Sequence, residues 1–110
     1  MSSSPLAAGA EYQPRGRVNH SIVQWCFNKT WDVEQTCRVA VQLGCKSVEV
    51  VGPEHWPTLK RYGLVCALAP SHLFTQGMNN PRYHPMCLEL LRKAIDDCAD
   101  AGFPAVITFT

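Results

Sequence analysis

The pattern of hydrophobic and polar positions changes several times along the chain, and each change predicts a boundary between a strand and a helix. Short runs of β-branched and aromatic residues predict strands, whereas apolar residues spaced three and four apart predict helices. The predicted strands are residues 18–27, 46–51, 64–69 and 104–110. Strands that alternate with helices are typical of a parallel sheet with right-handed crossover connections.

Helical spacing is clearest in two segments. The first has one apolar face, made by Val33, Cys37, Ala40 and Val41, with Thr30 or Asp32 as a candidate cap and Gly44 as a stop. The second has a longer apolar face that ends before Gly102, made by Cys87, Leu90, Leu91, Ala94, Ile95 and Cys98. A short third helix is predicted near residues 57–62, before Gly63. Residues 70–85 are predicted to form a long loop, a kind of segment that often carries function.

The order of elements suggests only part of a larger α/β protein. Residues 1–16 are rich in Ser, Ala, Gly and Pro and are predicted to be a mobile leader, so the folded domain is expected to span residues 17–110. Four parallel strands suit part of a (β/α)₈ barrel or of an open doubly wound sheet. No Gly-x-Gly-x-x-Gly follows the first strand, which disfavours a dinucleotide-binding fold. A complete barrel needs roughly 250 residues, so the chain is expected to supply its N-terminal portion, about four βα-type units.

Composition and charge exclude several classes of protein. Hydrophobic residues make up 46% of the chain and charged residues 17%, with a net charge of +1. No basic stripe indicates nucleic acid, and no apolar stretch is long enough to span a membrane. The six cysteines lack the spacing of a zinc site and are expected to be reduced, buried thiols. Reduced thiols and the absence of signal-peptide features predict a cytoplasmic protein.

Several blocks of sequence resemble one family. They are Gln24-Trp25-Cys26-Phe27, the stretch from Gly44 to Glu49, the stretch from Gly52 to Leu64, Gly77-Met78-Asn79-Asn80 with His84, and the stretch from Gly102 to Phe109. Together they resemble the hydroxypyruvate isomerase-like family of the xylose isomerase-like TIM barrels. The resemblance covers residues 17–110 in unbroken order.

The resemblance implies an enzyme that interconverts hydroxypyruvate and tartronate semialdehyde. It also implies a divalent metal, Mg²⁺ or Mn²⁺, in the full-length protein, whose ligands and catalytic carboxylates come mostly from strands beyond Thr110. No metal is expected to bind to this chain alone, and the chain alone is expected to be inactive. A metal-dependent sugar epimerase, an inositol-pathway dehydratase and a non-catalytic binding module remain open alternatives. The expected partner is a small-molecule substrate, and a homo-oligomer is compatible with the sequence.

Four residues are candidate substrate-binding groups. Glu49 lies within an apolar strand, where a carboxylate is costly unless it is paired or functional, and it is expected to face the barrel lumen. Trp25 lies at the carboxyl end of the first strand, where barrel active sites lie. Asn80 and His84 lie in the long loop on the same side, with a turn or cap before Pro81 as the alternative role of Asn80. His72, in the same loop, has a weaker case.

Overall fold

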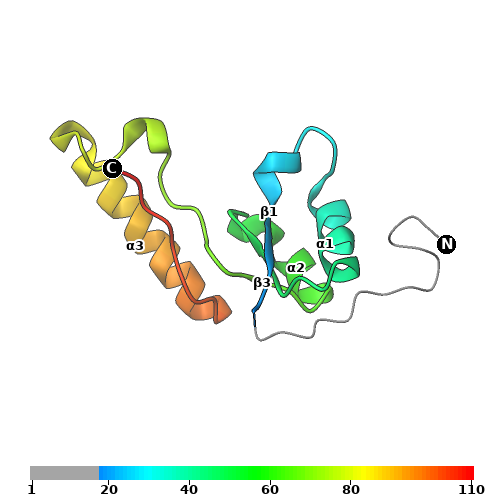
Figure 1. The fold of residues 1–110 in the computed structure, drawn as a ribbon. Helices are drawn as coiled ribbons and strands as arrows, with labels where there is room; N and C mark the ends of the chain where they lie inside the picture. Colours follow the sequence, from blue (N-terminus) through cyan, green and yellow to red (C-terminus); the bar gives the residue numbers. More distant parts are fainter. Residues whose placement is uncertain (1–17) are drawn as a thin grey trace.

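The computed structural model describes residues 18–110, which form an α/β fold with a three-stranded parallel sheet. The strands are β1 (Ser21–Val23), β2 (Ser47–Glu49) and β3 (Val65–Cys66), and they lie in the order β1–β2–β3. The strands run parallel, because the connections through α1 and α2 each return the chain to the same end of the sheet before the next strand begins (Figure 1). The predicted α/β class is therefore confirmed, and the prediction for residues 1–16 lies outside the described residues.

Three α-helices connect or follow the strands. They are α1 (Val33–Gln42), α2 (Trp56–Arg61) and α3 (His84–Ala101), with short 3₁₀ turns at Gln24–Phe27, Pro53–His55, Phe74–Gln76 and Pro81–Tyr83. Asp32, and not Thr30, caps α1: its carboxylate accepts the Gln35 N–H at 2.8 Å, and the Gln35 side chain accepts the Asp32 N–H. Gly44 and Gly102 follow α1 and α3 with φ near +76°, a conformation that glycine adopts without strain.

The first and fourth predicted strands are wrong in extent. Residues 18–27 contain only three strand residues, because the chain turns into a 3₁₀ helix at Gln24. Residues 104–110 are extended but make a single parallel bridge, between Ala69 and Val106, instead of a strand. Near the end of this segment, the Phe109 carbonyl accepts a hydrogen bond from the Met78 N–H at 2.9 Å, and not from the chain around Ala69. A continuous ladder therefore does not form.

The hydrophobic core lies on the side of the sheet that α1 and α2 cover. In register, Ile22 lies opposite Val48, and Val48 lies opposite Cys66. Val48 and Cys66 are fully buried, and Ile22 packs against the same cluster, which includes Leu59 of α2. Side chains alternate across a strand, so Val23, Glu49 and Val65 occupy the opposite face. That face is more open, since Val65 is 40% exposed.

Helix α3 lies apart from α1 and α2, beside the C-terminal segment (Figure 1). Cys87, Ala94 and Cys98 are buried on its predicted apolar face. Leu90 and Ile95, predicted for the same face, are 37% and 54% exposed. A cavity of about 370 Å³ remains next to Leu91 and Ile95, so this part of the apolar face is not fully covered. None of the helices in the described range is long and apolar enough to cross a membrane.

Candidate functional site

The carboxyl ends of the parallel strands define the candidate site. Parallel strands end at one edge of a sheet, and in α/β folds ligands bind at that edge. Trp25 follows β1 and Glu49 ends β2, whereas His72 and Thr108 lie beyond β3 and contact each other. These residues come from four separate segments of the chain.

Glu49 is the acidic group at this edge. It pairs in register with Val23 of β1 and lies on the face opposite the buried Val48. It is half-buried, and none of the ion pairs within residues 18–110 includes its carboxylate. Glu49 therefore places a carboxylate without an ion-pair partner from residues 18–110 at this edge of the sheet.

The backbone after Glu49 has an unusual conformation. Val50 has φ of +59° and is the one non-glycine residue with positive φ in the described range. A β-branched residue in this region is strained, by about 1–3 kcal/mol. The sequence predicts a strand through residue 51, and nothing in its apolar pattern indicates this turn.

Three hydrogen bonds hold the chain around Val50. Its N–H donates to the Leu68 carbonyl at 2.8 Å. The carbonyl of Val51, which is 2% exposed, accepts the Trp56 indole N–H at 2.7 Å and the Cys66 thiol at 3.7 Å. Trp56 itself is buried and packs edge-to-face on Phe103.

Trp25 lies in the 3₁₀ turn after β1 and is 56% exposed. Trp25 therefore does not belong to the hydrophobic core of residues 18–110. Cys26 beside it is also exposed, in contrast to the buried Cys66. Trp25 thus offers an apolar surface to solvent at the same edge of the sheet as Glu49.

Asn80 and His84 lie at the start of α3. The Asn80 side chain accepts the Arg82 N–H at 3.0 Å and so caps the short turn before the helix. His84 Nε2 lies 2.7 Å from the Met78 carbonyl oxygen and ties the loop to α3. This end of α3 is remote from the sheet (Figure 1), so the structure does not bring these two residues to Glu49. A substrate that contacts Asn80 or His84 as well as Glu49 would need a site that extends from the sheet to the start of α3.

His72 is more deeply buried than any of the four predicted residues, at 3% exposure. Its Nδ1 lies 2.9 Å from the Leu73 carbonyl, which can only accept, so Nδ1 carries the proton. Nε2 then accepts from the Thr108 hydroxyl at 2.8 Å and from the Phe109 N–H at 3.4 Å. All the hydrogen-bonding capacity of the ring is used, and His72 joins the long loop to the C-terminal segment.

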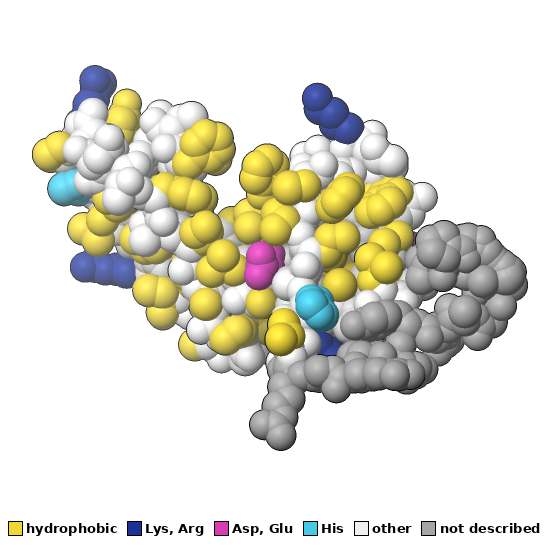
Figure 2. Space-filling view, in the orientation of Figure 1, with side chains coloured by type: hydrophobic (Ala, Val, Ile, Leu, Met, Phe, Trp, Pro, Cys, Tyr) yellow, Lys and Arg dark blue, Asp and Glu magenta, His cyan; other side chains and the backbone are white. Residues whose placement is uncertain are grey.

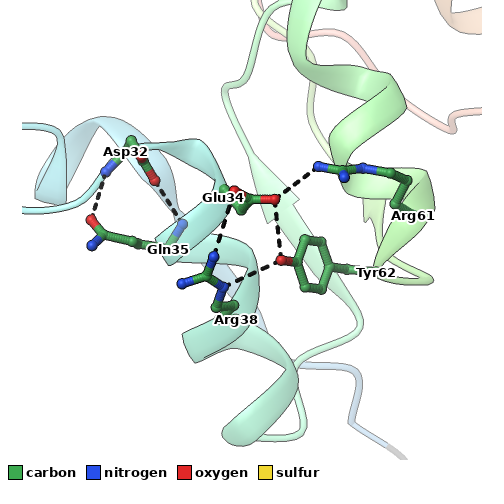
Figure 3. Close-up of polar contacts among 6 residues, drawn as sticks. All are labelled: Asp32, Glu34, Gln35, Arg38, Arg61 and Tyr62. Atoms are coloured by element: carbon green, nitrogen blue, oxygen red, sulfur yellow. Dashed lines mark hydrogen bonds and ion pairs between the residues drawn. The ribbon is translucent and has the colours of Figure 1, made fainter.

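A polar network lies on the surface between α1 and α2 (Figure 3). Glu34 accepts a hydrogen bond from Arg61 at 2.9 Å and forms an ion pair with Arg38 at 3.5 Å. The Tyr62 hydroxyl accepts a hydrogen bond from Arg38 at 3.3 Å and donates one to Glu34 at 3.4 Å. These side chains are largely exposed, and exposed ion pairs each contribute about 0–1 kcal/mol. The network links α1 and α2 at the surface.

The residues at hand do not by themselves fit the divalent metal that the resemblance implies. Within residues 18–110 there is no cluster of three or more His, Cys, Asp or Glu side chains. Mg²⁺ and Mn²⁺ prefer several oxygen ligands, and Glu49 is a single carboxylate. We therefore assign no chemical step to a metal held by these residues.

Burial suppresses the reactivity of most thiols. Cys37, Cys66, Cys87 and Cys98 are buried, as their apolar positions predict, and all six cysteines are free. Burial raises the pKa of the Cys66 thiol, although hydrogen bonding with the backbone of Val50, Val51 and Leu68 partly opposes the shift. Burial also raises the pKa of Cys37 and Cys98. A raised pKa leaves less thiolate, so these groups are poor nucleophiles.

Comparison with protein-family models, with curated proteins and with solved structures finds no match to this chain.

Proposed function

We propose that this chain forms part of a (β/α)₈ isomerase that acts on a small hydroxy-keto acid, of the hydroxypyruvate to tartronate semialdehyde type. Two things support the proposal: the family resemblance of the sequence blocks, and the parallel βα units with strands in sequential order. Sequential order is what a barrel requires. The observation that carries the proposal is the half-buried Glu49 carboxylate at the carboxyl edge of the sheet, which has no ion-pair partner within residues 18–110.

The reaction moves a proton between two adjacent carbons through an enediolate. A positioned carboxylate can accept or orient such a proton when it lies within hydrogen-bond reach of the substrate. Glu49 has the freedom to do so because it has no ion-pair partner within the described chain. Trp25, exposed at the same edge, would give the substrate an apolar wall.

The test compares the natural gene product with two variants in an assay of hydroxypyruvate isomerisation, with Mg²⁺, with Mn²⁺ and with a chelator. Glu49→Gln keeps the shape of the side chain and removes its charge. We expect kcat/KM to fall about tenfold or more, which corresponds to about 1.4 kcal/mol of transition-state stabilisation. Glu89→Gln is the matched control, since Glu89 is exposed on α3, and it should keep the wild-type rate.

The same experiment decides between the alternatives. Turnover of sugar phosphates or inositol derivatives, with none of hydroxypyruvate, would favour an epimerase or a dehydratase on the same fold. Equal rates for Glu49→Gln and the wild type would contradict the role of Glu49. No turnover of any of these substrates by the natural gene product would contradict the enzymatic proposal.

A further inference from the structure

Val50 is a strained residue directly after the candidate acid. Strained backbone persists only where the surrounding structure determines it, and such residues gather at active sites. Here the surrounding structure is specific. The Val50 N–H donates a hydrogen bond to the Leu68 carbonyl, and the carbonyl of Val51 accepts one from the buried indole of Trp56.

The strain has a geometric consequence for Glu49. A regular strand would continue the alternation and place Val50 on the same face as Val48. The left-handed turn at Val50 ends the strand immediately after Glu49, and Val51 enters the core, where it is 2% exposed. Glu49 is thereby the last residue of β2, with the chain leaving the sheet beyond it.

We propose that Val50 and Trp56 are positioning residues for Glu49: the hydrogen bond from the Trp56 indole to the Val51 carbonyl holds the strained turn, and the turn fixes the direction of the carboxylate. This inference rests on the proposed function. Neither residue touches the reacting atoms. Both act through the backbone, and the strain at Val50 is balanced by the burial of Val51 and Trp56.

Two variants of the natural gene product separate positioning from general stability. Trp56→Phe keeps an aromatic ring against Phe103 and removes the indole N–H. Val50→Gly removes the side chain and gives the backbone after Glu49 the freedom of glycine to adopt other conformations, so the turn no longer fixes the direction of the carboxylate. We expect both to lower kcat about tenfold while KM changes less than about twofold, because a displacement near 1 Å costs up to about a hundredfold in rate.

Matched control variants distinguish a loss of kcat caused by misplacement of Glu49 from a general loss of stability. Trp31→Phe changes a tryptophan that stacks on Phe27 outside this turn, and it should leave kcat unchanged. Val41→Gly removes a valine from the exposed side of α1 and should lower the melting temperature, because glycine destabilises a helix. Val50→Gly should lower the melting temperature less than Val41→Gly does. A wild-type kcat in both Val50→Gly and Trp56→Phe would overturn the inference.

A second measurement does not depend on activity. Crystal structures of the wild-type protein and of Trp56→Phe should differ in the position of the Glu49 carboxylate by about 1 Å or more, beyond the tolerance of about 0.5 Å for a productive site. An unmoved carboxylate would overturn the positioning role, whatever the enzyme assay gives. A moved carboxylate in a protein without isomerase activity would support the positioning role and refute the proposed function.

Discussion

The six cysteines occupy different environments, although the sequence predicts that all of them are buried thiols. Cys26 is exposed in the turn after β1, Cys45 is half-buried, and the other four are buried. The exposed position of Cys26 follows from the early end of β1, which the sequence did not indicate. Burial therefore had to be read from the structure for each thiol.

This difference predicts the order in which the thiols react. At pH 8, the raised pKa of Cys66 leaves less of this thiol as thiolate, and burial also hinders access. We expect iodoacetamide to label Cys26 rapidly and Cys66 only slowly, with labelling of Cys66 increasing as the pH rises. Peptide mass spectrometry after timed quenching measures both rates. Labelling in denaturant is the control and should reach all six thiols; equal rates in the folded protein would contradict the assignment.

Val50 shows the limit of reasoning from residue types. The run Ser-Val-Glu-Val-Val favours a strand through residue 51, because β-branched residues suit pleated backbone. The left-handed turn at Val50 depends on hydrogen bonds with Leu68, which is distant in sequence, and with Trp56, which lies after the turn. Tertiary contacts thus overrode local propensity at the residue next to the candidate acid.

Among the elements, the long segment 70–85 has more order than a loop prediction implies. It contains two short 3₁₀ turns, and it binds the C-terminal residues through Ser71, His72 and Met78. Gly77 lies where the two segments come closest, and it is buried. The contact explains why a glycine occupies this position even though its φ is negative, at −96°.

Gly77→Ala should therefore destabilise the fold. An added Cβ would collide with the backbone carbonyl of Thr110 and approach that of Phe109 at 3.0 Å. Because backbone cannot move as a side chain can, we expect a loss of about 1–3 kcal/mol in the free energy of unfolding. Urea denaturation measures the loss.

Gly52→Ala is the matched control for this contact. Its Cβ would meet only the end of the flexible Glu54 side chain, which can rotate away. The control should change stability by much less. A stability of Gly77→Ala equal to that of the wild type would show that the two segments do not touch in solution.

At the scale of the whole molecule, the described part of the chain leaves large apolar surface and sheet edges uncovered. Figure 2 shows hydrophobic side chains over much of one face. Phe74 and Leu73 are 68% and 67% exposed, and Ile95 is 54% exposed. Within residues 18–110, β1 pairs only with β2, so its other edge has no strand beside it. Unpaired edges and apolar patches favour association.

The 110-residue chain produced by itself is therefore expected to self-associate. Size-exclusion chromatography with light scattering should give a mass that rises with protein concentration. Leu73→Lys combined with Ile95→Lys places charges on exposed positions and should raise the monomer fraction. Lys29→Gln, at an exposed polar position, is the control. A monomer at all concentrations would contradict the expectation.

Sequence alone determined the features that depend on neighbours along the chain. The α/β class, the Asp32 cap region, the glycine stops and the placement of Glu49 on the face opposite Val48 follow from periodicity and residue chemistry over a few positions. Only the tertiary structure decided the length of each strand, the left-handed turn at Val50, and the separation of Asn80 and His84 from Glu49. The physical reason is that these features depend on hydrogen bonds and packing between distant segments, such as Ala69 with Val106.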